Sequence, residues 1–177
     1  MPPVSVRLAT SADAALLADL GARTFRDAFG PDNAPADVEQ HVAATHAPAA
    51  VAANLADPDA TVLIATDASG QPLGYAALLA GSAIAPVRAH APLELERLYV
   101  ENAATGGGVG SALMQAVLGH AADAGHDVVW LGVWERNTRA IRFYERWEFR
   151  AVGDKTFTVG TDVQRDLVLA RSVGPES

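Results

Sequence analysis

Glycine is concentrated at one place in this chain, between a strand-like segment and an amphipathic helix expected over residues 109–124. Glycine allows the positive φ angles of a tight turn and leaves no Cβ between its N–H group and a ligand. The helix N-terminus adds free N–H groups and a positive dipole end. The stretch therefore predicts a pyrophosphate-binding anion site, the alternative being a turn that uses glycine only for its geometry. The residues expected to form this site are Thr105, Gly106, Gly107, Gly108, Val109, Gly110 and Ser111.

Two known kinds of phosphate-binding turn, the P-loop and the dinucleotide-binding turn, are alternatives for this stretch. A P-loop ends in Gly-Lys-Ser/Thr, whereas Gly110 is followed directly by Ser111, so an NTPase is disfavoured. The dinucleotide-binding fingerprint is closer, because Gly106, Gly108 and Ser111 keep most of its spacing. Glu135 could also take the part of its ribose-binding acid. That turn normally follows the first strand of a parallel sheet, whereas two antiparallel-looking segments precede it here. A dinucleotide site stays a lower-ranked alternative.

The hydrophobic pattern of the rest of the chain switches between the periods of strands and helices. We expect strands over residues 4–8, 61–66, 72–80, 93–100, 127–135, 150–159 and 164–171. We expect helices from a cap at Thr10 or Ser11 to residue 28, over 35–46, 48–56 and 109–124, and from a cap at Asn137 to residue 147. Strands on both sides of a strand–helix–strand–helix stretch indicate a single α/β domain around a mixed sheet.

Length and composition bound the class of protein. The chain has 177 residues, of which 50% are hydrophobic and 19% charged, which is typical of one globular domain. We expect this domain to cover residues 1–171, with a disordered tail over 172–177. The sequence contains no cysteine, so disulfides, a thiolate metal site and a cysteine nucleophile are excluded. The histidines lack ligand spacing, and we expect no metal.

The charge balance narrows the partners. A formal net charge of -8 argues against nucleic acid, because phosphate binding needs clustered Lys and Arg. The same charge fits a cationic small molecule, although mere solubility would explain it as well. No apolar run is long enough for a transmembrane helix, and the N-terminus does not read as a signal peptide. We therefore expect a cytoplasmic protein that contacts neither membrane nor nucleic acid.

A second motif lies downstream of the glycine stretch. Asn137, Ala140, Phe143 and Tyr144 have the spacing Asn-x-x-Ala-x-x-Phe-Tyr. With the strand 95–100, which reads Leu-x-x-Leu-Tyr-Val, and with Gly-x-Gly at 108–110, this pattern resembles the GNAT superfamily of acyl-CoA N-acetyltransferases. The resemblance covers residues 93–150 well. It implies a mostly antiparallel sheet of about seven strands, with helices on both faces and a gap between the fourth and fifth strands.

Some positions depart from the family pattern. Thr105 stands where the family usually has Gln or Arg, and Gly107 where a basic residue is common. A side-chain contact to the pyrophosphate is therefore lost, while the backbone cradle is kept. Glu148 replaces the usual glycine before Phe149, at the exit from the helix. These changes bear on the affinity for coenzyme A.

The resemblance implies acetyl-CoA as cosubstrate and assigns roles to single residues. Tyr144 would be the general acid, and Asn137 would contact the CoA arm besides capping its helix. The backbone of Leu98, Tyr99 and Val100 would pair with the pantetheine as an added strand. An amine needs a base to take its proton. Glu96 is our hypothesis for that base, with Glu94 or water alone as rivals and an ion pair as the purely structural alternative.

Three stretches, residues 24–29, 93–100 and 130–135, resemble the bacterial PaiA-type spermine/spermidine acetyltransferases, as does 160–166. This implies a polyamine or another small amine as acceptor and, from the superfamily, a homodimer. The rivals are acetylation of protein lysines or N-termini and a catalytically silent acyl-CoA-binding module. The residues expected to contact the acceptor are Phe25, Asp27, Phe29, Glu94 and Trp134.

Overall fold

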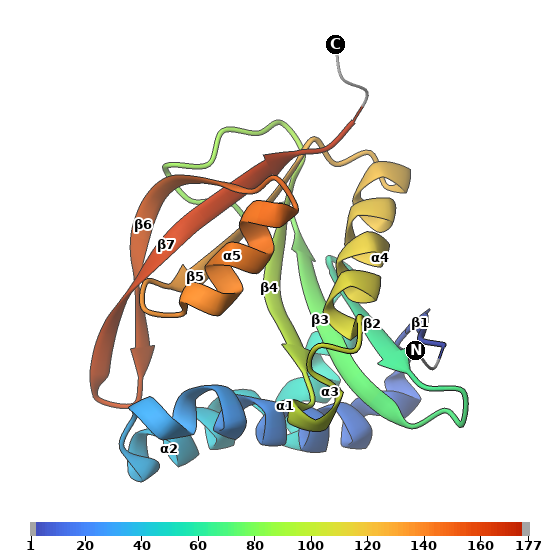
Figure 1. The fold of residues 1–177 in the computed structure, drawn as a ribbon, viewed down its shortest axis with the longest axis vertical. Coiled ribbons are helices and arrows are strands. Elements are labelled where there is room, and N and C mark those ends of the chain that lie inside the picture. Colours follow the sequence, from blue (N-terminus) through green and yellow to red (C-terminus); the bar gives the residue numbers. More distant parts are fainter. Residues whose placement is uncertain (1–2, 175–177) are drawn as a thin grey trace.

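The computed structural model describes residues 3–174 and places their strands in one seven-stranded sheet of order β1-β2-β3-β4-β5-β7-β6 (Figure 1). The pair β4/β5 is parallel, and all the other pairs are antiparallel. The predicted mixed, mostly antiparallel sheet is therefore confirmed. The strands are β1 (Ser5–Leu8), β2 (Ala60–Thr66), β3 (Pro72–Ala80), β4 (Pro92–Val100), β5 (Val128–Trp134), β6 (Arg150–Val159) and β7 (Asp162–Ser172).

Helices cover both faces of this sheet (Figure 1). Successive residues of β2 point to opposite faces of the sheet. Leu63 packs with residues of α4 on one face, and Ile64 packs with residues of α1 on the other. The first face carries α4 (Val109–Asp123) and α5 (Thr138–Arg146), and the second carries α1 (Ala14–Phe29), α2 (Pro35–Thr45) and α3 (Pro48–Ala56). The helices predicted on both faces are thus confirmed.

Thr10 caps the first helical segment, as predicted, although the opening turn is 3-10 and α1 itself begins at Ala14. A short 3-10 turn, Ser11–Asp13, precedes the helix. Asp13 organises it: its carboxylate accepts two hydrogen bonds from Arg7 at 2.8 Å and one from the Thr10 N–H at 2.8 Å. The Arg7 guanidinium lowers the pKa of Asp13 to about 2. The reciprocal contacts of Thr10 and Asp13 form a capping box, and Arg7 adds an ion pair from six residues upstream.

The fourth and fifth strands separate after a short shared segment. Only Pro92–Glu94 pairs with Val128–Trp130. On its other edge β4 stays paired with β3 as far as Val100, with one irregularity: Leu95 and Arg97 oppose consecutive residues of β3, so Glu96 is an extra residue. Such a bulge bends a strand and redirects its side chains. The predicted gap between β4 and β5 is therefore confirmed.

The C-terminal strand runs further than expected. β7 ends at Ser172, and the Val173 N–H donates to the carbonyl oxygen of Asp127 at 2.8 Å. Residues 175–177 of the expected tail lie outside the described residues. Near this end of the sheet, the loop between β3 and β4 covers β5, where the indole N–H of Trp130 donates to the Ser82 carbonyl at 2.7 Å. Trp130 is therefore a core residue.

Candidate active site

The glycine turn has the backbone geometry that its composition predicts. Gly106 and Gly108 both have φ of +83°, and Gly108 is the N-cap of α4. The first bond of the helix runs from the Ala112 N–H to the Gly108 carbonyl, so the amides of the first turn have no acceptor within the helix. The turn is mostly exposed to solvent. An anion can therefore reach these amides without displacing side chains, and the residues fit a pyrophosphate.

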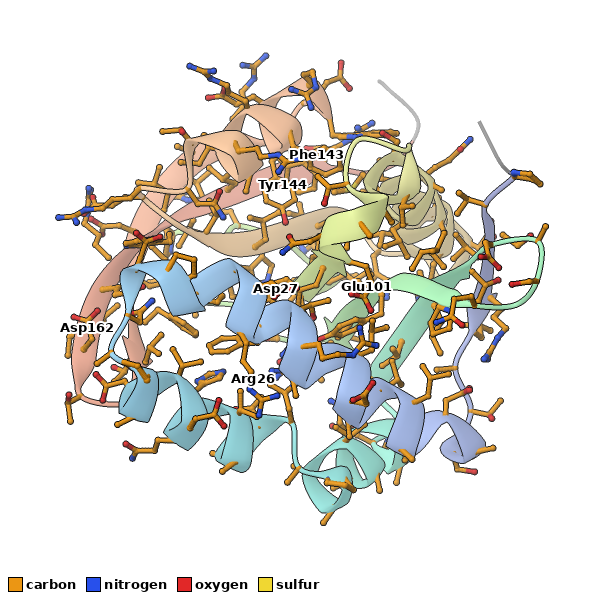
Figure 2. All side chains as sticks on the ribbon, turned by 60° about the horizontal axis from the view of Figure 1, so that its bottom comes forward. Arg26, Asp27, Glu101, Phe143, Tyr144 and Asp162 are labelled. Carbon is orange, nitrogen blue, oxygen red and sulfur yellow. The ribbon has the colours of Figure 1, made fainter. Side chains whose placement is uncertain are left out.

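The side chain of Thr105 turns away from this role. Its hydroxyl donates to the Glu101 carbonyl at 3.2 Å, within the same loop. Glu101 in turn forms an ion pair with Arg23, so α1 is tied to the start of the turn. Figure 2 shows Glu101 beside the helix that carries Asp27. An anion at this turn would therefore contact backbone amides and not the Thr105 hydroxyl.

The gap between β4 and β5 leaves an unpaired strand edge. From Leu95 to Val100 the β5-facing edge of β4 has no strand partner among the described residues. Free N–H and C=O groups on such an edge can pair with an extended ligand that contains amides. Leu98, Tyr99 and Val100 lie on this segment, just before the glycine turn. The glycine turn follows this edge along the chain, after the short 3-10 turn Asn102–Ala104.

A cavity of about 300 Å³ occupies the gap. Strands β4 to β7 supply its walls, and α1, α2 and α5 contribute residues around it. The opening lets side chains from both faces of the sheet meet in one space. The polar and aromatic residues that line it are Phe29, His41, Glu94, Glu96, Arg97, Tyr99, Trp134, Asn137, Tyr144, Lys155, Phe157 and Asp166.

Tyr144 reaches the cavity from α5 (Figure 2). Asn137 begins this helix, because its side-chain oxygen accepts a hydrogen bond from the Ala140 N–H at 3.1 Å. The Tyr144 ring packs edge-on against Phe143 and Phe149, at centroid distances of 5.4 Å and 5.7 Å. Burial raises the pKa of the Tyr144 phenol above its ordinary value. The hydroxyl therefore stays protonated at neutral pH and is available as a proton donor.

Two carboxylates of β4 enter the same cavity but differ in their surroundings. Glu94 accepts a hydrogen bond from the Ser82 hydroxyl at 2.6 Å. Glu96, at the bulge, keeps access to solvent, yet its enclosure by the cavity walls raises the pKa of its carboxyl, and the charge of Glu94 adds to this while Arg97 opposes it. A carboxylate with a raised pKa is a better proton acceptor at neutral pH.

Sequence reasoning missed several residues of the cavity, of which Asp166 is the most deeply buried polar one, at 5% exposure. Burial raises its pKa to about 6, while Lys155 acts in the opposite direction. Asp166 lies opposite Trp134 of β5 and Lys155 of β6 in the sheet. The sequence did contain a signal for this burial. Residues two apart in a strand face the same side of the sheet, so Asp166 shares its side with the apolar Val168, which is buried.

The expected acceptor residues are only partly gathered at the cavity. Phe29, Glu94 and Trp134 line it. Phe25 is 1% exposed and lies in the core, stacked on His41, which itself lines the cavity. Asp27 is an exposed residue of α1 outside the cavity lining (Figure 2). The acidic groups that face the cavity thus come from strands and not from the first helix.

The described residues hold no group of three or more His, Cys, Asp or Glu side chains suited to a metal ion. Among their helices, none combines the length and apolar character that crossing a bilayer requires.

A glycine turn with free amides, an unpaired strand edge and a cavity lined by Tyr144 are the features expected of a group-transfer site. The sequence matches the Acetyltransferase (GNAT) family over residues 23–149, and the chain belongs to this family of acetyltransferases. An uncharacterized N-acetyltransferase of Mycobacterium tuberculosis (strain ATCC 25618 / H37Rv) is 38% identical over 161 residues, which cover 91% of this chain and 98% of that protein.

Solved structures share the fold. The PaiA N-acetyltransferase from Thermoplasma acidophilum, in complex with coenzyme A, superposes with a TM-score of 0.76 at 16% identity, covering 96% of this chain and 99% of that one. The acetyltransferase yncA from Salmonella typhimurium, with its cofactor acetyl-CoA, superposes with a TM-score of 0.67 at 18% identity, covering 99% and 96%. At these identities the likeness concerns the fold.

Proposed function

We propose that this acetyltransferase moves the acetyl group of acetyl-CoA directly to the nitrogen of a small primary amine, with polyamines as the first class to test. The observation that carries the proposal is that Tyr144, Glu94 and Glu96 line one cavity beside the unpaired edge of β4. The relatives solved with coenzyme A and with acetyl-CoA support the choice of donor. The PaiA neighbour supports polyamines only through its fold, and the homodimer expected from the family stays a prediction.

In this mechanism the amides of the glycine turn bind the pyrophosphate, and Asn137 and the edge of β4 hold the pantetheine arm. The amine nitrogen attacks the thioester carbonyl carbon, so that a C–N bond forms and the C–S bond breaks. The proton of the amine passes to Glu96, directly or through water. The departing sulfur receives the phenolic proton of Tyr144. Tyr144 can donate because a phenol, with an ordinary pKa of about 10, is protonated at neutral pH, and burial raises the pKa of Tyr144 further. Glu96 then releases its proton to solvent and the Tyr144 phenolate takes one up, so that both residues return to their starting states.

The walls of the cavity are compatible with a small cationic acceptor. Three carboxylates, those of Glu94, Glu96 and Asp166, line it together with the cationic side chains of Arg97 and Lys155. Phe29 of α1, His41 of α2 and Phe157 of β6 add aromatic rings to this lining. A small amine with a charged group and an apolar chain suits a mixed lining of this kind.

Replacing Tyr144 with phenylalanine tests the proposed acid. We expect Tyr144→Phe to lower turnover at least tenfold, about 1.4 kcal/mol of transition-state stabilisation, without weakening acetyl-CoA binding. Release of coenzyme A with spermidine, spermine, simple amines and lysine peptides measures turnover, and calorimetry measures binding. Tyr75→Phe is the matched control, because Tyr75 is also buried, has a hydroxyl without a partner and lies outside this cavity. Equal turnover in both variants would exclude Tyr144 as the acid.

The base is tested by comparing Glu96→Gln with Glu94→Gln. The raised pKa of Glu96 means that its carboxylate form is lost as the pH falls from neutral, so activity should decline on the acid side. We expect Glu96→Gln to lower kcat at least tenfold and to remove this acid limb from the pH profile. Glu94→Gln should keep the limb. The reverse result would assign the base to Glu94, and an unchanged profile in both variants would assign it to water.

A further inference from the structure

Asp166 of β7 is a buried carboxylate that the acid–base assignment does not use. It is 5% exposed, and its Oδ1 has no hydrogen-bond partner. Within residues 3–174, none of the ion pairs includes it. Leaving a buried charged group unpaired is costly, and most such groups in proteins have partners. An unpaired carboxylate that lines a cavity therefore points to a ligand that supplies the partner.

The local structure directs this carboxylate into the cavity. Asp166 lies in the sheet between Trp134 of β5 and Lys155 of β6. A Cβ added to Gly132 would lie 3.2 Å from Oδ2 of Asp166 and would overlap the Cε of Lys155. The missing side chain at Gly132 therefore leaves the space over β5 that Asp166 and Lys155 occupy at the cavity wall.

The position of Asp166 complements the reacting groups. Glu96 lies on β4, on the other side of the gap, whereas Asp166 lies on β7, beyond β5. The nitrogen that is acetylated has to lose a proton, so it cannot remain an ammonium ion at its site of reaction. A carboxylate on a different wall is therefore free to bind a second, permanently charged nitrogen. A charge-assisted N–H···O bond away from water is among the stronger hydrogen bonds.

Resting on the proposed function, we infer that Asp166 binds the non-reacting ammonium group of the acceptor, so that the site selects diamines and polyamines over monoamines. One nitrogen of such an acceptor lies between Glu96 and Tyr144 and receives the acetyl group. The other donates to the Asp166 carboxylate. Asp166 neither gives nor takes a proton in the reaction, and its contribution is to position the acceptor.

A chain-matched pair of substrates tests this assignment. We expect kcat/KM for 1,4-diaminobutane to exceed that for butylamine at least tenfold in the wild-type protein. Asp166→Asn should abolish this preference by lowering kcat/KM for 1,4-diaminobutane at least tenfold, and a cooperative urea-unfolding transition shows that the variant folds. Asp154→Asn is the control, because Asp154 is exposed on β6, pairs with Arg165 and does not line the cavity. It should keep the preference.

Binding gives a readout that does not depend on turnover. Calorimetric titration of 1,4-diaminobutane into the protein saturated with coenzyme A should show an affinity that rises as the pH increases through about 6, where Asp166 ionises. Both nitrogens of the ligand stay charged over this range, since amines titrate near 10. Other charged or titratable groups also face the space: Lys155 of β6, Glu94, Glu96, Tyr99 and Arg97 of β4, His41 of α2 and Tyr144 of α5. The rise should therefore persist in Glu96→Gln and His41→Gln and disappear in Asp166→Asn.

The outcomes separate this inference from the function on which it rests. If the wild-type protein acetylates butylamine and the diamine equally well, or if Asp166→Asn keeps the preference, the assignment of Asp166 is wrong while the proposed function stands. If the protein binds acetyl-CoA but acetylates no amine, the proposed function is wrong and the assignment falls with it.

Discussion

The surroundings of the opening in the sheet shift the pKa values of several residues. Burial raises the pKa of Tyr144, partial enclosure by the cavity walls raises that of the solvent-accessible Glu96, and burial raises that of Asp166 to about 6. The phenol of Tyr144 is protonated at neutral pH and can supply the proton that the leaving sulfur needs. The carboxylate of Glu96 becomes a better proton acceptor. Perturbed groups of this kind gather at functional sites because the same enclosure that costs folding energy makes them useful. Asp166 shows that cost most directly.

At the residue scale we predict that Asp166→Asn stabilises the fold at pH 8. Its carboxyl has a pKa of about 6 in the folded chain against an ordinary value of 3.8, so the folded state holds the proton more tightly. Stability is therefore lost as the pH rises from about 4 to above 6, by up to about 3 kcal/mol for this shift. Urea unfolding should show Asp166→Asn more stable than wild type at pH 8 and equal to it at pH 4. A variant less stable at pH 8 would mean that the carboxylate has a partner.

Two elements carry most of the site, and both depend on a local irregularity. The bulge at Glu96 bends β4 where it leaves β5. The glycine turn reverses the chain between β4 and α4 through the left-handed conformation of Gly106 and Gly108. In Figure 1, α4 and α5 lie on either side of the space where β4 and β5 separate. The strand and the helix have regular backbone geometry in their interiors, and each irregularity lies where the element borders the opening.

At the element scale we predict opposite effects for two glycines of the α4 region. Gly108→Ala places a side chain at φ +83°, which costs about 1–2 kcal/mol, and should weaken coenzyme A binding at least tenfold by distorting the turn. Gly119→Ala, at an exposed position inside α4 with nothing near its Cβ, should stabilise the fold by about 0.5–1 kcal/mol and leave binding unchanged. Urea unfolding and calorimetry measure both. Unchanged binding in Gly108→Ala would argue against an anion at this turn.

Buried groups far apart in the molecule shape the response of the whole fold to acid. His46 is buried and its pKa is lowered to about 4 from 6.5, so stability is lost as the pH falls from about 6.5 toward 4. Asp166 acts in the opposite direction between about 6 and 4. Asp13, whose pKa is about 2 against 3.8, adds a loss that falls below pH 4. The contributions of His46 and Asp166 to the free energy of unfolding are of similar size, about 3 kcal/mol each.

At the scale of the whole molecule we therefore predict a nearly level stability between pH 6 and 4 and a steep loss below pH 4. Asp166→Asn should remove the compensating contribution, so that its stability declines from pH 6 downward. Thermal unfolding from pH 2 to 8 in both proteins measures this. A wild-type curve that already falls steadily from pH 6 to 4 would show that the compensation is absent.

Much of this fold and part of its site are determined by the sequence alone. The strand and helix segments, the glycine turn and the Asn137 cap depend on periodicity, on left-handed φ angles and on a side chain that reaches its own helix, which are all local properties. The resemblance to the family predicted the gap between β4 and β5, and the strand register confirms it. The roles of Tyr144 and Glu96 stay predictions.

The tertiary structure decided which other residues face the opening. Asp166, Lys155 and His41 come from β7, β6 and α2, and no local pattern relates them to Glu96. They meet because β7 is inserted between β5 and β6, and because the register of these strands turns Asp166 and Lys155 inward over Gly132. Strand order and register result from packing between distant segments, whereas turns and caps result from neighbours in the chain.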